Sequence, residues 1–163
     1  EGNENLSPVI DTQKMSLYLI QNRLNNPVSG TTPDFVAETV NTGGSASAKY
    51  VTKPVILENT STALDIRLSA NIRTTSAVKM YYRTSSAEDV RTLGDVVWTA
   101  FNSDGTPDSA VAPAEDDTTL REQQYSASSL AGFTAFQLKA VLTGTNSSYP
   151  PVIKDLRGIA LAV

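Results

Sequence analysis

The stretch ALDIRLSANIR (residues 63–73) alternates between apolar and polar side chains from Leu64 onward. Its apolar members are Leu64, Ile66, Leu68, Ala70 and Ile72. Because side chains two residues apart point to the same face of a strand, this pattern predicts a half-buried β-strand. The fold is therefore expected to be built on sheets that each bury one face.

Three further segments show the same two-residue period, namely VKMYYR (78–83), DVVWTAF (95–101) and FTAFQLKAVLTG (133–144). Each is predicted to be a strand with one apolar face. The predicted inward residues are Val78, Met80, Tyr82, Val96, Trp98, Phe136, Leu138, Ala140 and Leu142. The predicted outward residues are Lys79, Tyr81, Arg83, Val97, Thr99, Gln137, Lys139 and Thr143.

Two segments add strands at either end of this set. KYVTKPVIL (49–57) contains Pro54, which cannot donate to a strand ladder, so an edge or a strand start is expected there. The closing run VIKDLRGIALAV (152–163) ends without alternation. A continuous apolar run is typical of a strand covered on both faces, so GIALAV is expected to be a central strand or one covered by a neighbouring subunit.

The connectors carry turn residues in place of the apolar helices that a parallel sheet needs. The sequence therefore predicts an all-β fold, an antiparallel β-sandwich of jelly-roll or Greek-key type, over residues 46–163. Residues 1–45 are expected to be an extended N-terminal arm or linker that packs on the sandwich or on a partner. The chain begins with Glu1 and not with Met, so a processed chain or a piece of a longer protein is expected.

Large apolar residues in the arm predict a protein contact, because a monomer that left them in water would risk aggregation. The candidate interface residues are Met15, Leu17, Leu19 and Ile20. The alternative that Leu17 to Ile20 form one more strand of the same domain stays open. Arg157 is a further interface candidate, since a charge in an apolar strand needs a carboxylate, and Asp155 lies on the same strand face. The simpler interpretation is a salt bridge at the rim of the sheet.

Composition excludes several classes of chemistry. The chain has neither Cys nor His, which removes disulfides, thiolate or imidazole zinc sites, and the Ser-His-Asp and Cys-His catalytic pairs. A net charge of −4 disfavours a nucleic-acid partner, and no apolar stretch approaches the roughly 20 residues of a membrane helix. We expect no enzyme, no catalytic residue, no metal and no cofactor.

Acidic residues between 102 and 117 are the one set that could hold a metal. They are Asp104, Asp108, Glu115, Asp116 and Asp117, with Asn102 nearby. An EF-hand needs a glycine at its sixth position and a glutamate at its twelfth, and here Gly105 directly follows Asp104. Solvated turns are therefore predicted, with a different kind of calcium site as the alternative.

Aromatic residues offer an alternative function. Trp98 and the outward-pointing Tyr81 could stack on sugar rings, as in a carbohydrate-binding β-sandwich module. A tryptophan at an alternating strand position is more often a core residue. Both interpretations stay open from the residues alone.

Several segments together resemble tail structural proteins of T-even-like contractile-tailed bacteriophages, in particular baseplate wedge components. They are SPVIDTQKMSLYLIQNRLNNP, GGSASAKYVTKPVIL, ALDIRLSANIRTTSAVKMYYRTSS, VVWTAFNSDG and FTAFQLKAVLTGTNSSYPPVIKDLRGIAL. They span nearly the whole chain.

The resemblance implies a non-enzymatic virion building block that contacts copies of itself, as a homo-oligomer, and other tail or baseplate proteins. It implies a place in the tail baseplate, after assembly in the host cytoplasm, and a longer parent protein. It also marks Tyr50 to Leu57 as the lead-in to the sandwich and Pro150 to Leu161 as its closing strand. No catalytic residue is carried over, because the family has none.

Overall fold

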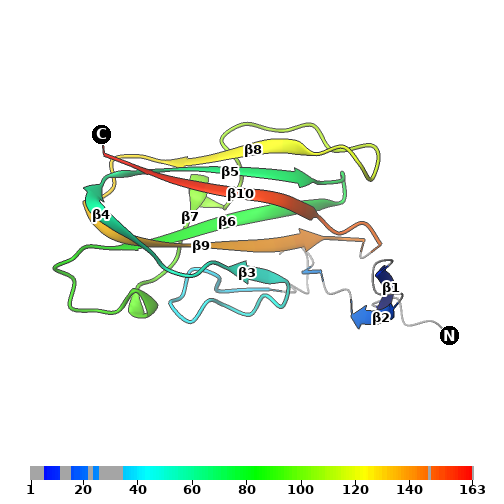
Figure 1. The fold of residues 1–163 in the computed structure, drawn as a ribbon, viewed down its shortest axis with the longest axis horizontal. Helices are drawn as coiled ribbons and strands as arrows, with labels where there is room; N and C mark the ends of the chain where they lie inside the picture. Colours follow the sequence, from blue (N-terminus) through cyan, green and yellow to red (C-terminus); the bar gives the residue numbers. More distant parts are fainter. Residues whose placement is uncertain (1–5, 12–15, 22–23, 26–34, 147, 163) are drawn as a thin grey trace.

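The computed structural model describes residues 6–11, 16–21, 24–25, 35–146 and 148–162. Figure 1 shows long strands in two layers that run along the long axis of the molecule. In chain order the elements are β1 (Leu6–Asp11), β2 (Ser16–Gln21), β3 (Lys49–Val51), β4 (Val55–Ser61), β5 (Ala63–Asn71), β6 (Ser76–Ser85), η1 (Leu93–Asp95), β7 (Thr99–Ala100), η2 (Phe101–Ser103), β8 (Arg121–Ala127), β9 (Phe133–Gly144) and β10 (Val152–Leu161).

Two antiparallel sheets form the body of the molecule, which confirms the predicted all-β sandwich. The smaller sheet has the strand order β10-β5-β8, and the larger has the order β3-β9-β6-β7 with β4 also paired to β9. From β7 onward the chain changes sheet at every connection, through β8, β9 and β10. A separate two-stranded sheet, β1-β2, precedes the body.

The core lies between the two sheets and uses the inward faces predicted for β5, β6 and β9. Its buried members are Leu64, Ile66, Leu68, Ala70, Val78, Met80, Phe101, Tyr125, Phe133, Phe136, Leu138 and Ala140. Tyr125 of β8 brings a hydroxyl into this core, where it donates to Gln123 Oε1 at 2.7 Å. Burial of that hydroxyl is tolerated because it has a hydrogen-bond partner.

Pro54 separates β3 from β4, and both strands pair with the same side of β9. Lys49 lies opposite Val141, and Val55 lies opposite Phe136. This position at the margin of the larger sheet confirms the edge placement predicted from the proline.

The segment DVVWTAF forms much less strand than predicted. Trp98 is buried and Val97 is 60% exposed, as the alternation required. However, η1 and η2 flank the segment, so the ladder with β6 is limited to Thr99 and Ala100. Tight turns on either side leave no room for a longer strand.

The closing strand β10 differs from the prediction, because it is neither central nor covered on both faces within one chain. Among the described residues it pairs only with β5, as the edge of the smaller sheet. Ile159 is 47% exposed and Leu161 is 42% exposed. The apolar run therefore marks exposed surface as well as core contact.

The outer face of β9 also differs from the prediction. Gln137, Lys139 and Thr143 were expected in solvent, but their exposed fractions are 7%, 0% and 2%. Part of the stretch 35–48 packs over this face, with Phe35 and Ala46 buried beside Val141. Lys139 hydrogen-bonds to this covering segment, at Glu38 and Gly43. Gln137 donates instead to the Thr52 backbone oxygen, and Thr143 to that of Ala77, so all three polar side chains have partners at buried positions.

Candidate interaction surface

A groove opens on one flank of the sandwich, where the larger sheet extends one strand beyond the smaller one. Its volume is about 530 Å³. We call it the flank groove. It is lined by Tyr50, Thr52 and Val55 on one side, by Phe136, Leu138 and Ala140 at its floor, and by Ile153, Lys154, Asp155, Leu156 and Gly158 on the other side.

The groove follows from the strand order. Strand β10 packs over β9, since a Cβ on Gly158 would lie 3.3 Å from Leu138 Cδ1. Strands β3 and β4 continue the larger sheet past β9. In the part of the chain that the structure describes, no strand of the smaller sheet lies beyond β10, so Tyr50 of β3 and Val55 of β4 stay exposed there.

Large apolar side chains are exposed along the three strands that border the flank groove. Their exposed fractions are Tyr50 57%, Val51 40%, Val55 40%, Ile56 75%, Val152 54%, Ile159 47% and Leu161 42%. Of these, Tyr50 and Val55 line the flank groove, whereas Ile159 and Leu161 share the outer face of β10 with Arg157. Large exposed apolar side chains beside a groove are typical of an interaction site. The unpaired edge of β10 adds backbone groups that another strand could bond.

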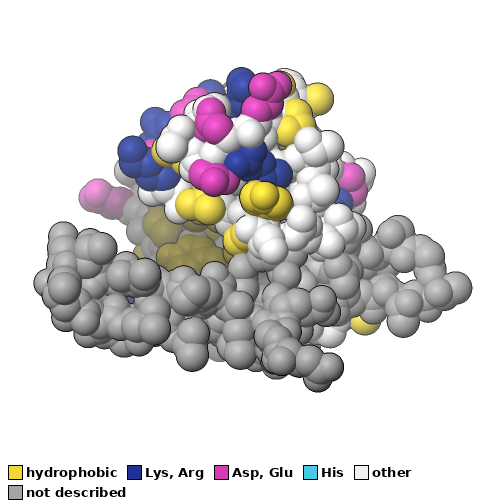
Figure 2. Space-filling view, turned by 90° about the vertical axis from the view of Figure 1, so that its right-hand side faces the viewer, with side chains coloured by type: hydrophobic (Ala, Val, Ile, Leu, Met, Phe, Trp, Pro, Cys, Tyr) yellow, Lys and Arg dark blue, Asp and Glu magenta, His cyan; other side chains and the backbone are white. Residues whose placement is uncertain are grey.

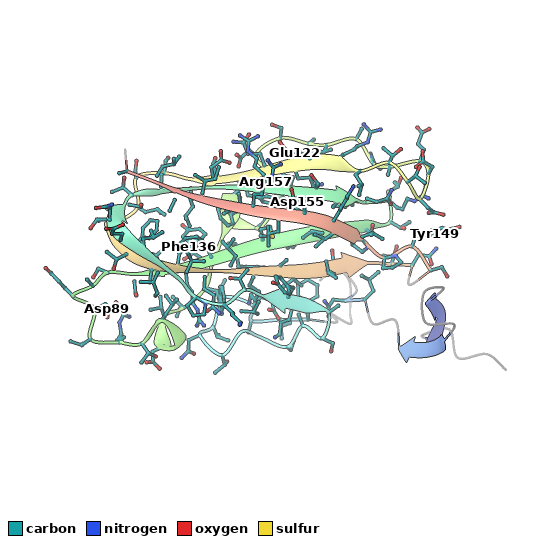
Figure 3. All side chains as sticks on the ribbon, in the orientation of Figure 1. Asp89, Glu122, Phe136, Tyr149, Asp155 and Arg157 are labelled. Carbon is teal, nitrogen blue, oxygen red and sulfur yellow. The ribbon has the colours of Figure 1, made fainter. Side chains whose placement is uncertain are left out.

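The outer face of the smaller sheet is polar and carries its own counter-charges. Arg157 Nη2 lies 2.5 Å from Glu122 Oε2, and its Nε lies 3.0 Å from Asp155 Oδ2. Figure 3 shows Glu122 on β8 and the other two residues on β10. Arg67 extends the row from Glu122 to Asp65. The hydrogen bonds that Arg67 donates to the Asp65 carboxylate are the main reason that the pKa of Arg67 is raised.

This row answers the question raised by Arg157. Its side chain is 54% exposed and paired with Asp155, as the simpler interpretation required. Exposed pairs of this kind contribute about 0–1 kcal/mol, so the row keeps the face soluble more than it stabilises the fold.

The other candidate interface residues lie at the limit of what the structure describes. Met15 is outside the described residues. Leu17, Leu19 and Ile20 belong to β2, whose backbone pairs with β1 in the register Leu17↔Ile10 and Leu19↔Pro8. Their side chains are outside the described part of the molecule.

One end of the sandwich, seen in Figure 2, intersperses basic and acidic side chains with hydrophobic ones. Arg73 is typical of such mixed surface, because it forms an ion pair with Asp117 and lies 5.4 Å from the centroid of the Tyr149 ring. Opposite charges so close together leave no field of one sign for steering a charged ligand.

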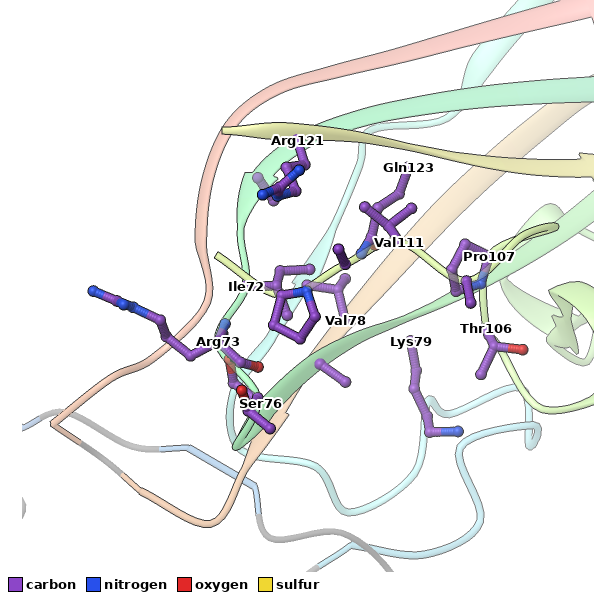
Figure 4. Close-up of a pocket in the computed structure, with 16 residues that line it drawn as sticks. Ile72, Arg73, Ser76, Val78, Lys79, Thr106, Pro107, Val111, Arg121 and Gln123 are labelled. Carbon is purple, nitrogen blue, oxygen red and sulfur yellow. Dashed lines mark hydrogen bonds between the residues drawn. The ribbon is translucent and has the colours of Figure 1, made fainter. Parts of the chain in front are cut away.

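A second cavity, of about 390 Å³, lies between β5, β6 and the loop 106–113. Figure 4 shows Ile72, Val78 and Val111 at its centre, while Arg73 and Lys79 extend their charged ends away from it. Lys79 Nζ instead donates to the Asp104 backbone oxygen at 2.8 Å. The cavity is therefore a hollow beneath the loop in which the charged groups of Arg73 and Lys79 do not converge.

The two aromatic residues named for sugar stacking are not accessible. Tyr81 points away from Met80 as predicted, but it is only 6% exposed, and Trp98 is 4% exposed. Both rings lie beneath the stretch 35–48 and face cations of the same chain. Arg83 lies 4.3 Å from the Trp98 centroid, and Lys139 Nζ lies 4.8 Å from the Tyr81 centroid.

Three acidic residues of the long loop accept hydrogen bonds from neighbouring loop residues. Asp104 accepts hydrogen bonds from Thr106, and Asp108 accepts them from Asn102 and from the Ser126 backbone. Asp116 accepts from the backbone and hydroxyl groups of Thr118 and Thr119, which lowers its pKa. Within the described residues no three acidic side chains, Glu115 and Asp117 included, converge as metal ligands.

Comparison with protein-family models, with curated proteins and with solved structures finds no match to this chain. A search of the described residues also finds no helix long and apolar enough to span a membrane. Function must therefore be inferred from the sequence and from the geometry of the flank groove.

Proposed function

We propose that this chain is a non-enzymatic structural building block of a contractile bacteriophage tail, a baseplate wedge component that acts through protein–protein contacts. The observation that carries the proposal is the flank groove, an apolar surface beside an unpaired edge strand of ten residues, Val152–Leu161. Permanent assemblies cover such surfaces, and edge strands are a common way to do so. The sequence resemblance to tail proteins supplies the kind of assembly.

The distribution of polar groups is in keeping with this role. On the outer face of the smaller sheet, Arg157 is paired with Glu122 and Asp155. In the long loop, Asp104 and Asp116 accept hydrogen bonds from neighbouring turn residues. The flank groove, in contrast, is lined mainly by apolar side chains, of which Tyr50 and Val55 are exposed. In this proposal the chain resides in the virion tail baseplate, and its partners are copies of itself and other tail or baseplate proteins.

The glycan-binding alternative rested on Tyr81 and Trp98. Because both rings are buried under the chain itself, neither offers a stacking surface. No other observation favours that function, so we do not propose it.

Incorporation into particles tests the proposal. A tagged chain should be recovered by mass spectrometry from purified tailed particles, and antibody labelling should place it at the tail end. Val55→Asp should reduce incorporation, because Val55 is 40% exposed and lines the flank groove, so the change puts a charge into the apolar surface. Val90→Asp is the matched control, since Val90 is 99% exposed and lies outside the flank groove. Absence of the wild-type chain from particles would refute the structural role.

A further inference from the structure

We propose that the flank groove binds the N-terminal strand β2 of a second copy, which pairs with β10 and completes the smaller sheet. The inference deepens the proposed function, since it names the contact by which copies of the chain would assemble. It can be tested separately from the location of the chain in a particle.

The shape of the groove selects an extended segment over a folded neighbour. The vacancy is one strand wide, above β3 and β4 and beside β10. If the edge strand of a second sandwich paired with β10, the larger sheet beneath that strand would occupy the space already taken by β3 and β4. Stacked sheets lie about 10 Å apart, so both cannot fit. Only a strand without its own second layer can enter.

The arm supplies such a strand. In the described part of the chain, β1 and β2 pair only with each other. An isolated two-stranded hairpin is marginally stable in water and needs a surface to pack on. Strand β2 reads SLYLIQ, which contains no proline and no charge, whereas β1 contains Pro8, which lacks an N–H. Strand β2 is therefore the better partner for β10.

Charge favours the same pairing. Lys154 lines the flank groove and Lys53 lies beside it, between Thr52 and Val55. Neither lysine has an ion pair among the described residues. The two arm strands carry a single charged residue, the acid Asp11 at the end of β1. The acid that also lines the groove, Asp155, is already paired with Arg157. Docking of the hairpin therefore brings the Asp11 carboxylate toward two lysines that have no ion pair in the described part of the chain.

The root of the arm is fixed on the sandwich. Asn25 is 2% exposed, its side-chain amide donates to the backbone oxygens of Ala48 and Leu142 at 2.8 Å, and its Oδ1 accepts from the Ser47 N–H at 2.8 Å. Residues 22–25 join β2 to this anchor, and four residues span at most about 14 Å. Figure 1 shows β1 and β2 beyond the end of the sandwich, away from the middle of β10. Because the arm is anchored at Asn25 and its strands lie beyond the end of the sandwich, we infer that it docks on a neighbouring copy.

Cross-linking of the full-length chain tests the proposal, because the absence of native cysteine makes each introduced thiol unique. Copies carrying Leu19→Cys are mixed with copies carrying Lys154→Cys and treated with a short bis-maleimide. A covalent heterodimer is expected. The same Leu19→Cys copies mixed with Val90→Cys copies should give none, since Val90 is exposed but distant from the flank groove.

Two outcomes would overturn the inference. The first is equal cross-linking to both partners, or none. The second is that a double variant, Leu19→Cys with Lys154→Cys, reacts only within one chain, which would place the arm in its own groove. Leu19→Asp should also convert an oligomer measured by light scattering into a monomer that keeps the far-ultraviolet circular dichroism spectrum of the wild type. Incorporation into particles is measured in a separate experiment. A negative cross-linking result would therefore refute the docking of β2 without deciding whether the chain belongs to a phage tail.

Discussion

Replacing Lys139 by Met tests whether a buried ion pair holds the stretch 35–48 on the sandwich. The Lys139 ammonium has no exposed surface and donates to Glu38 Oε2 at 2.9 Å. It also donates to the backbone oxygens of Glu38 at 2.5 Å and Gly43 at 3.1 Å. Glu38 Oε1 in turn accepts from the Ala46 N–H at 2.7 Å. Met keeps most of the apolar stem, so the change removes mainly the charge.

The expected loss is large because the Glu38 side chain is only 3% exposed and would be left as an unpaired carboxylate. Removal of one partner from a buried ion pair costs about 3–5 kcal/mol of unfolding free energy. In a chain of this length each kcal/mol corresponds to about 2–4 °C. The melting temperature of Lys139→Met should therefore fall by about 6–20 °C.

Urea unfolding followed by tryptophan fluorescence is a suitable assay. Trp98 is the sole tryptophan, and its ring centroid lies 4.9 Å from Lys139 Nζ. Lys53→Met is the matched control, since Lys53 is exposed and has no ion pair among the described residues. A double variant, Glu38→Leu with Lys139→Met, should lose less than the sum of the single changes, because the two charges are then removed together. A loss for Lys139→Met equal to that of Lys53→Met, or strict additivity, would refute the reasoning.

Three further outcomes follow from the packing of the core and of the long loop. Burial raises the pKa of the Tyr125 hydroxyl, so the contribution of this group to the stability of the fold is complete below pH about 10 and is lost at higher pH. In urea titrations from pH 7 to 11, the free energy of unfolding of Tyr125→Phe should decline less at alkaline pH than that of the wild type. At pH 7 the variant should be about 1–2 kcal/mol less stable. Hydrogen bonds, chiefly from Thr119, lower the pKa of Asp116, so the contribution of this carboxylate to the stability of the fold is present above pH about 4 and is lost as the pH falls. In thermal melts from pH 2 to 6, the melting temperature of Asp116→Asn should depend less on pH than that of the wild type. Gly158→Val should cost about 1–3 kcal/mol in urea titration, more than Gly158→Ala, because even a Cβ would lie 3.3 Å from Leu138 Cδ1.

The alternating strands could be predicted because their periodicity records which face is buried. The inward faces of β5, β6 and β9 became the core, and Pro54 marked the margin of the larger sheet. The pairing of Arg157 with Asp155 followed from their two-residue spacing on one strand. These features depend on local geometry, which a sequence pattern records directly.

The candidate surface could not be predicted, because it depends on which strands lie beside and above one another. The run GIALAV indicated burial, yet β10 is an exposed edge strand. It packs over β9 of the larger sheet, and among the described residues no further strand pairs with its open edge. Lys139 looked like a solvent residue until the stretch 35–48 folded over it and supplied Glu38. Local sequence determined the strands and their faces, since those depend on side-chain spacing. Only the tertiary structure decided that the outer face of β9 is buried under the stretch 35–48 and that the flank beside β10 stays exposed, since both depend on contacts between segments far apart in the chain.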